Sequence, residues 1–303
     1  RICFALISDR HISFQSMMKL KKYSSMRVGV RLKAHQPVKE LVVHTFGSSS
    51  SKPSPTTFDN IVDIIKFDDQ LNSILFRGLR VIELWMKSVM TNDVTKRFEH
   101  PAWYAEPDLL RPDIRPSHFL PVNDEVKKIL EYASGRQIKA HQPVKDWLST
   151  RSEAVPLMIL GEEAGFKFWG YLYRLLDEPQ KVDISMRANL TPETLLSWLR
   201  FLGDLRNSCA HHDILWNRVY MKAMQPQPKI ARALQERSFT KERTDGKELI
   251  ARRIYLIYHV LHYIGAEGNE WLAELKALLI QAPNLRTMGF QPDWAEEPEW
   301  NLY

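Results

Sequence analysis

Cysteine is almost absent from this chain: its 303 residues include only Cys3 and Cys209. Two cysteines give neither a disulfide framework nor a thiolate metal cluster, and this scarcity indicates a reducing compartment, so we expect a cytoplasmic protein. The sequence also lacks an apolar run long enough to span a bilayer, and the apolar stretch 3–8 is too short for a signal peptide. We therefore expect no membrane partner. The chain begins with Arg1, so its native start can lie further upstream.

Glycine is scarce, with 12 residues, whereas tryptophan is plentiful, with 9. This composition favours helices around a large aromatic core over a sheet protein rich in turns, and no segment shows a convincing strand pattern. Hydrophobic content of 44% and charged content of 26% are typical of a soluble globular protein. We therefore predict an all-α fold. Helical apolar spacing or helix caps occur in the segments 58–85, 123–134, 161–176, 192–205, 252–264 and 270–279.

Local signals add detail to this pattern. Thr191 followed by Pro192 predicts a helix start, with a capping side chain and then proline at the first helical position. Asn123 is expected to cap a helix after the proline-rich segment 101–122, which is expected to be an irregular connection. Gly78, inside the first long helix, predicts close packing or a kink.

Acidic residues are nearly missing from residues 1–39, where nine lysines and arginines stand against one aspartate. The segment 47–55, rich in glycine, serine and proline, reads as a linker, so we divide the chain into a basic N-terminal segment, 1–55, and a helical domain, 56–303. A basic arm suits a phosphate backbone, and the alternative is an ordinary solvated face. The candidate RNA-binding residues in the arm are Lys19, Lys21, Lys22, Arg27 and Arg31.

The seven residues Lys33–Lys39, KAHQPVK, recur identically as Lys139–Lys145. Each copy is followed by an acidic residue, but the flanking sequences share little, so this is not a solenoid or propeller repeat. We have no physical account of this repeat and assign it no function.

The most specific pattern is the string RNSCAHHDILWNR, which runs from Arg206 to Arg218. It is predicted to lie at the C-terminal end of the helix that starts near Pro192. On a helix Asn207 and His211 share a face, whereas Arg206 lies about 140° round from His211. Long side chains, or a fraying helix end, must therefore bring Arg206 and His211 together.

These residue types suit cleavage of RNA without a metal. RNA supplies its own nucleophile, the 2′-hydroxyl, so an enzyme needs a base, an acid and positive charge for the transition state. His211 titrates in the range for proton transfer. Arg206 stays charged and grips phosphate oxygens bidentately. Asn207 can orient the histidine or the phosphate, and the products would be a 2′,3′-cyclic phosphate and a 5′-hydroxyl.

Each residue of the string also has a purely structural interpretation. Bare Arg-x4–6-His spacing recurs elsewhere in this chain, for example at Arg253 and His259, and such matches are mostly accidental. Arg206 could be a surface salt-bridge residue and His211 a core histidine. The remaining members have their own alternatives: His212 assists His211 or faces solvent, Asn217 and Arg218 bind phosphate or cap a helix, and Cys209 and Trp216 are expected to pack in the core.

The string resembles the HEPN ribonuclease motif, and in particular the Abi-like abortive-infection family of the AbiD/AbiF type from bacterial phage defence. The resemblance extends over roughly residues 44–303 and includes a C-terminal block at 288–300. It implies a HEPN-type helical bundle with additional helices, here preceded by the basic segment. Three positions depart from the family: Asn72 and Lys87 replace its usual arginine, and Lys167 its usual glycine.

The resemblance implies an enzyme, a metal-independent endoribonuclease that acts as a toxin in antiviral defence, with Arg206, Asn207 and His211 as catalytic residues and no cofactor. RNA is the expected partner, as substrate or as a structured regulatory RNA. A homodimer through the motif is also expected, because two histidines divide the acid and base roles and this chain has one motif. The alternative is a non-catalytic HEPN-fold protein that binds a structured RNA. A third hypothesis is a metal-dependent hydrolase that uses His211, His212, His259 and His262, although no ligand spacing supports it.

Overall fold

The computed structural model describes residues 58–110, 113–134, 142–151, 154–220, 248–266, 268–282, 284–296 and 300. Within these ranges the chain is mostly helical, which confirms the predicted all-α fold. The exception is a two-residue antiparallel pairing between β1, Val219–Tyr220, and β2, Glu248–Leu249. Two residues are too few to show the alternation by which a strand is recognised in sequence. No helix in the described ranges is long and apolar enough to cross a membrane.

In chain order the described helices are α5 (Phe58–Ser88), the π-helix η1 (Val89–Val94), α6 (Thr95–Phe98), the 3-10 helices η2 (Trp103–Ala105) and η3 (Pro107–Leu109), α7 (Pro116–Ser134), α8 (Gln142–Thr150), α9 (Leu157–Leu160), α10 (Phe166–Leu175), α11 (Glu178–Arg187), α12 (Pro192–Ala210), α14 (Ile250–Tyr263), α15 (Gly268–Ile280), and the 3-10 helices η4 (Arg286–Met288) and η5 (Trp294–Glu296).

The basic arm, with its five candidate RNA-binding residues, and the linker 47–55 lie outside the described residues. The proposed boundary at residue 55 therefore stays a prediction. The first copy of the repeated segment also lies outside, and the last four residues of the second copy begin helix α8.

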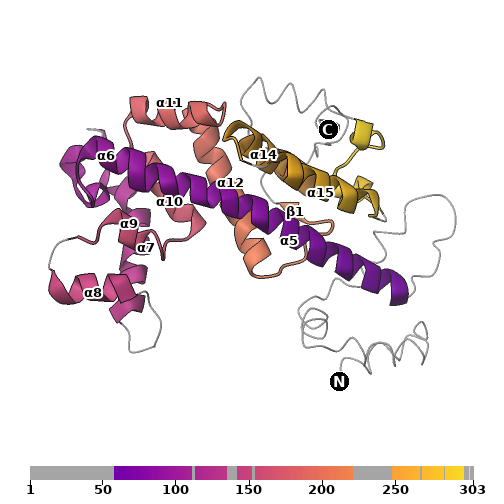
Figure 1. The fold of residues 1–303 in the computed structure, drawn as a ribbon, viewed down its shortest axis with the longest axis horizontal. Helices are drawn as coiled ribbons and strands as arrows, with labels where there is room; N and C mark the ends of the chain where they lie inside the picture. Colours follow the sequence, from indigo (N-terminus) through magenta and orange to yellow (C-terminus); the bar gives the residue numbers. More distant parts are fainter. Residues whose placement is uncertain are drawn as a thin grey trace.

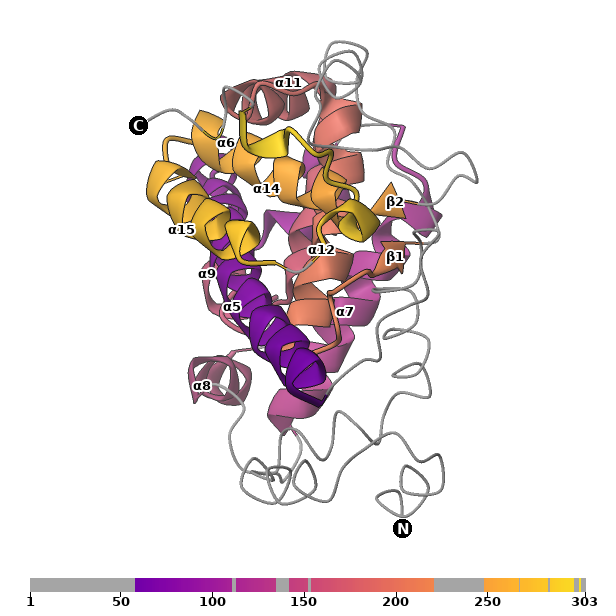
Figure 2. The same cartoon turned by 90° about the vertical axis from the view of Figure 1, so that its right-hand side faces the viewer.

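Helix α5 is the central element of the fold. Its 31 residues make it about 46 Å long at the rise of an α-helix. Apolar residues recur along it at helical spacing, and it packs against α10, α12, α14 and α15. Figures 1 and 2 show α5 running through the described part of the molecule, with α14 and α15 lying together against it. A helix that is contacted from several sides fixes the relative positions of its neighbours.

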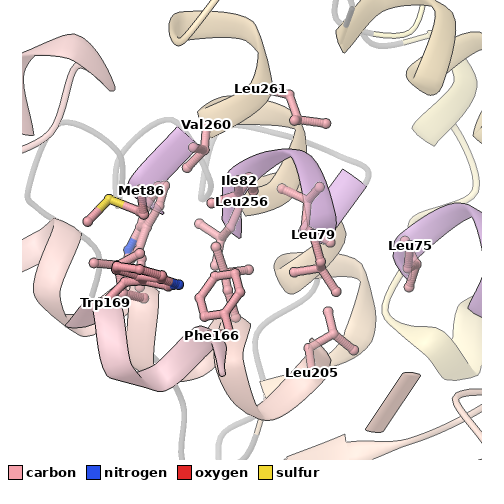
Figure 3. Packing of buried hydrophobic residues seen from close by; sticks show 14 of the residues in the cluster. Leu75, Leu79, Ile82, Met86, Phe166, Trp169, Leu205, Leu256, Val260 and Leu261 are labelled. Carbon is pink, nitrogen blue, oxygen red and sulfur yellow. The ribbon is translucent and has the colours of Figure 1, made fainter. Parts of the chain in front are cut away.

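Helix α12 carries the Arg/His string and crosses α5. It begins as predicted, with Thr191 as the cap that accepts a hydrogen bond from the backbone of Thr194 and Pro192 at the first helical position. It packs against α5, α10, α11 and α14. The core between these helices is built from side chains of α5, α10, α12 and α14 (Figure 3): Leu75, Leu79, Ile82, Met86, Phe166, Trp169, Leu205, Leu256, Val260 and Leu261.

Two helix starts differ from the prediction. Helix α7 begins at Pro116 within the segment expected to be irregular, and Asn123 lies in its interior instead of capping it. Pro121 lacks the N–H that a helix interior uses, but α7 packs against α10, and this tertiary contact outweighs the local signal. The helix predicted from residue 161 begins later, at Phe166 of α10, and the short helix α9 ends just before the predicted start, at Leu160.

Gly78 marks close packing, one of the two alternatives that the sequence left open. A β-carbon at this position would lie 2.7 Å from Nε1 of Trp271 and 2.9 Å from Ile257. The Trp271 indole N–H donates to the Ile74 carbonyl at 2.8 Å, one turn earlier on α5. Glycine at position 78 therefore lets α14 and α15 approach α5 closely.

Candidate active site

The string begins in the last turn of α12, as predicted, and its first histidine ends the helix. Arg206 and Asn207 are helical, and His211 is the C-cap, with φ −87° and ψ 2°. The backbone N–H of His211 still donates to the Asn207 carbonyl at 2.9 Å. Helix geometry therefore fixes the backbone of His211, while its side chain is exposed.

The chain leaves α12 through a Schellman turn centred on His212. The His212 N–H donates to the Cys209 carbonyl at 3.0 Å, and the Asp213 N–H donates to the Ser208 carbonyl at 2.9 Å. His212 has φ 54°, in the left-handed region that usually requires glycine at this position of the turn. The turn thus presents two adjacent exposed histidines at the C-terminal end of α12.

The Arg206 side chain faces α5. Its Nε donates to Oε2 of Glu83 at 3.3 Å, and its guanidinium lies 5.8 Å from the centre of the Phe76 ring. The side chains of Arg206 and Glu83 are 27% and 16% exposed, so the pair lies at the edge of the core. Neither Nη group of Arg206 donates a hydrogen bond to any described residue. The anchored Nε leaves the outer edge of the guanidinium facing away from its protein partner.

The carboxyl group of Glu83 is disfavoured in its charged form. Burial raises its pKa above the ordinary glutamate value, and the charge and hydrogen bond of Arg206 lower the pKa by less than burial raises it. The charges of Arg80 and Lys87, on the same helix, also favour the carboxylate. The ion pair with Arg206 therefore does not fully repay the cost of desolvating Glu83.

The loop after the histidines is held by two polar side chains from α5. Asp68, which is 2% exposed, accepts hydrogen bonds on Oδ1 from the backbone N–H of Leu215 at 2.8 Å and of Trp216 at 2.6 Å. Asn72, also buried, donates from Nδ2 to the Asp213 carbonyl at 3.5 Å. Helix α5 therefore contacts the string on both sides of the histidines.

The other predicted binding residues also contact this loop. Arg218 donates to Asp213 at 3.1 Å and lies 5.6 Å from the centre of the Tyr220 ring. Asn217, at φ 54°, accepts a short hydrogen bond from the Thr287 hydroxyl in η4. Both side chains are half-buried, so they hold the loop in place and keep only part of their surface for a ligand.

Cys209 and Trp216 pack in the core, in agreement with the prediction for each. Both are 1% exposed, and the Trp216 ring meets Phe67 of α5 edge to face at 5.1 Å. Burial, with a smaller contribution from the charge of Asp68, raises the pKa of the Cys209 thiol to about 12. A buried neutral thiol is no nucleophile.

The second Arg/His spacing in the described ranges differs from the string in burial. Arg253 is 2% exposed and His259 is 7% exposed. Arg253 donates to the Phe201 carbonyl at 2.9 Å and stacks on Tyr220, and His259 contacts the Ala188 carbonyl at 3.2 Å. This second pair is thus part of the core, whereas Arg206 is half-buried and His211 is exposed.

The structure brings Arg206, Asn207, His211 and His212 to one end of α12, but it does not join them directly. The side chains of Asn207 and His211 make no hydrogen bond with any described residue, and none links Arg206 to His211. Among the described residues, no three His, Cys, Asp or Glu side chains gather as metal ligands. The metal-dependent hypothesis therefore gains no support from the described histidines.

Sequence reasoning missed the α5 residues that hold the string: Asp68, Asn72, Phe76 and Glu83. These residues lie within an arc of about 80° on α5, from 100° per residue. The available signal was the presence of Asp68 and Asn72 on a helix face otherwise lined with leucine and isoleucine. A polar side chain on an apolar stripe is expected to have a buried partner.

The three positions that depart from the family pattern also have partners. Lys87 pairs with Glu162 at 2.6 Å, and Lys167 pairs with Asp204 at 2.7 Å. A β-carbon at Gly203 would lie 3.0 Å from the Lys167 side chain, so the lysine stem packs closely on α12. With the Asn72 contact to the loop, all three side chains join α12 or its neighbours to the rest of the fold.

Fold and site together define an all-α protein that presents an arginine and two histidines at the C-terminal end of a helix packed against α5. The chain belongs to the Abi-like protein family, whose sequence model matches residues 36–217. The match includes α5, α12 and the loop as far as Asn217, and it ends before the C-terminal block at 288–300 that the resemblance included. No curated protein and no solved structure shows significant similarity to the chain.

Proposed function

We propose that this protein is a metal-independent endoribonuclease of the HEPN type that acts in phage defence by cutting RNA. One observation carries the proposal: His211 is exposed at the end of α12, and about one turn earlier Arg206 is anchored through Nε, while neither Nη group donates a hydrogen bond to a described residue. The Nη groups of Arg206 are therefore available to donate to an RNA phosphate. Membership of the Abi-like family supports the role in abortive infection.

The chemistry is an internal transesterification. The 2′-oxygen of one nucleotide attacks the neighbouring phosphorus, and His211 accepts the proton of the 2′-hydroxyl as general base. The bond from phosphorus to the 5′-oxygen breaks, and a second histidine donates a proton to that leaving oxygen. The products are a 2′,3′-cyclic phosphate and a 5′-hydroxyl, and no atom from a cofactor is required.

Arg206 binds the phosphate that reacts. Its two Nη groups can each donate to a non-bridging oxygen, which is the bidentate geometry that guanidinium offers to phosphate. Glu83 holds the Nε edge, so the guanidinium plane is oriented before RNA binds. Charge on the phosphate rises in the transition state, and a fixed cation stabilises that state more than the ground state.

The remaining polar residues of the string have supporting roles in this proposal. The Asn207 amide, one turn before His211, can orient the imidazole or a phosphate oxygen. His212 follows His211 directly, and Arg218 pairs with Asp213 in the loop after the histidines, so both can contact the flanking phosphates of the RNA. The basic arm then adds RNA affinity that does not depend on sequence.

We also propose a homodimer in which the ends of two α12 helices face one RNA strand. The reaction uses a base and an acid, and His211 from each protomer would supply one of them. Mixing wild-type protein with an excess of His211→Ala protein tests this arrangement, because a mixed dimer keeps one His211 and lacks either the base or the acid. We expect the added variant to lower cleavage per wild-type chain by at least about 10-fold at high excess, and cleavage that stays proportional to the wild-type chains would argue against shared sites.

The decisive experiment is incubation of the purified full chain with RNA in EDTA, followed by mapping of the cleaved ends. We expect cyclic phosphate and 5′-hydroxyl ends, no cleavage where the substrate carries 2′-deoxyribose at the cut site, and at least a 10²-fold loss for His211→Ala, the lower range of proton-transfer catalysis. His262→Ala is a matched control, because His262 is also exposed but lies on α14. Tight RNA binding without cleavage by the wild type would favour the non-catalytic RNA-binding alternative.

A further inference from the structure

The turn that carries the two histidines is fixed by α5 as well as by α12. Asp68 is 2% exposed, and a single oxygen of its carboxylate accepts both the Leu215 and the Trp216 backbone N–H. Hydrogen bonds to a carboxylate are about twice as strong as those between neutral groups. The chain from His211 to Trp216 is short, so the anchor acts within five residues of His211.

A second polar side chain of α5 also holds this loop. Asn72 lies one turn after Asp68 and donates to the Asp213 carbonyl at 3.5 Å, and Phe67 supports the ring of Trp216 at 5.1 Å. Three side chains of α5 thus contact the backbone or a side chain of the loop that leaves the helix end. The Schellman turn fixes the other end of this loop to α12.

Helix α5 also holds Arg206. Phe76 and Glu83 lie on the same face of α5 as Asp68 and Asn72, about two and about four turns beyond Asp68. Because an α-helix has a fixed rise of about 1.5 Å per residue, the two sets of contacts are held at a fixed separation. One helix, α5, therefore contacts both the Arg206 side chain and the loop that follows the histidines.

We propose that Asp68 is a positioning residue, which places His211 relative to Arg206 through the backbone of residues 213–216. The proposal rests on the proposed ribonuclease activity and names a residue of that site outside the Arg/His string. Asp68 does not touch RNA in this arrangement, because it is buried beneath the loop. Asp68 therefore affects the reaction indirectly, by fixing the position of the His211 imidazole.

A graded set of substitutions tests the proposal. Asp68→Asn keeps the shape and one oxygen acceptor but removes the charge. Asn72→Ala removes the longer bond to Asp213. Asp63→Asn is the matched control, because it makes the same change on the same helix at a side chain that is 71% exposed and pairs with Lys66.

Steady-state cleavage of a defined RNA is the first measurement. We expect Asp68→Asn to lower kcat by about 10- to 100-fold, since small displacements of a reacting group have effects of this size. The KM should stay within about threefold, because the phosphate is bound by Arg206. Asn72→Ala should show a smaller loss of kcat and Asp63→Asn none. If kcat per folded molecule is unchanged and only the unfolding midpoint of Asp68→Asn falls, Asp68 is a structural residue and the proposal is overturned.

The second measurement does not require activity. Imidazole signals of His211 and His212 in NMR spectra, assigned with His211→Ala and His212→Ala, report the surroundings of the two rings. We expect Asp68→Asn to shift both signals while the His262 signal stays unchanged, and Asp63→Asn to shift none. Unmoved His211 and His212 signals would overturn the proposal even in an active enzyme. Shifted signals in a wild type that does not cut RNA would support the positioning and refute the ribonuclease.

Discussion

Arg206, in the last turn of α12, and Glu83, on α5, are joined by a hydrogen bond of 3.3 Å from Nε to Oε2 across 123 residues of sequence. The bond occupies the inner edge of the guanidinium and leaves its Nη groups without a described partner. Burial disfavours the carboxylate, so the pair is a poor source of stability. Its more direct consequence is that the Arg206 guanidinium is held by its Nε edge against α5.

Arg206→Lys should remove activity although the charge is kept. Lysine has no Nε edge for Glu83 and no planar pair of donors for phosphate oxygens. We expect cleavage to fall by about 10²-fold, the cost of one misplaced reacting group, with a smaller loss of RNA affinity. Arg200→Lys is the control, because Arg200 is exposed on the same helix. Equal cleavage rates for the two variants would mean that charge alone matters at position 206.

Glu83→Gln should distinguish the role of Glu83 in orienting Arg206 from its contribution to the free energy of unfolding. The pKa of Glu83 is raised in the folded protein, so between the unfolded pKa and the raised value the folded state binds more protons. Stability from this group is therefore present at low pH and falls as the pH rises through that window. We expect the glutamine variant to lose this slope and, at pH 7, to stay within about 1 kcal/mol of the wild-type free energy of unfolding.

Denaturant unfolding at several pH values measures that slope. The same variant keeps an oxygen that can accept the Arg206 Nε hydrogen, whereas Glu83→Ala does not. We expect the alanine variant to lose about 10- to 100-fold in cleavage, as losses of orienting partners do elsewhere, and the glutamine variant to lose less. A large loss of stability in Glu83→Gln would show that the ion pair is primarily structural.

His212→Gly should raise stability. His212 occupies the left-handed position of the Schellman turn, where a residue with a β-carbon is strained by about 1 kcal/mol. We expect a gain of about 0.5 kcal/mol, because the more flexible unfolded chain offsets part of the relief. Ala210→Gly, in the last helical turn, should instead lose about 1 kcal/mol. A destabilised His212→Gly would mean that the imidazole makes contacts worth more than the strain.

The Cys209 thiol should resist modification while the protein is folded. It is 1% exposed, and burial raises its pKa to about 12. At pH 8 almost no thiolate is present, so a thiol reagent should react with Cys209 only after unfolding. Reaction is measured by mass spectrometry of the Cys209 peptide with and without denaturant. Rapid labelling in the native protein would contradict the packing around the end of α12.

The basic arm should change the salt dependence of RNA binding. Each phosphate contact that is lost lowers the slope of log K against log salt by roughly 1. We expect a chain without residues 1–39 to bind RNA with a shallower slope and the same cut sites. An unchanged slope would assign the arm to the solvated surface.

The sequence predicted the elements whose signals are local. Thr191 and Pro192 mark the start of α12 because capping and proline geometry act within one turn, and the apolar period carries the helix to Arg206. The prediction that Asn123 caps a helix was wrong, because asparagine caps helices and also occurs inside them. The packing of α7 on α10 decides between the two positions. The burial of Cys209 and Trp216 was also predictable, because both residue types favour the core.

The contacts of Asp68, Asn72 and Glu83 with the string could not be predicted from spacing. They join residues more than 120 positions apart, and a one-dimensional pattern contains no information on which faces of two helices meet. The pattern indicates only that a buried polar side chain needs a partner. The partner follows from the way α12 crosses α5.

The family match ends at residue 217, but residues after that position also pack against the matched part. Helices α14 and α15 lie against α5, Trp271 fills the space above Gly78, and the Thr287 hydroxyl reaches back to Asn217. A fragment that stops at residue 217 would expose one flank of α5 to water and would lose a tether of the loop beside the histidines. The stretch by which the family is identified is therefore shorter than the unit that packs around α5, and we expect a truncated version to need the C-terminal helices.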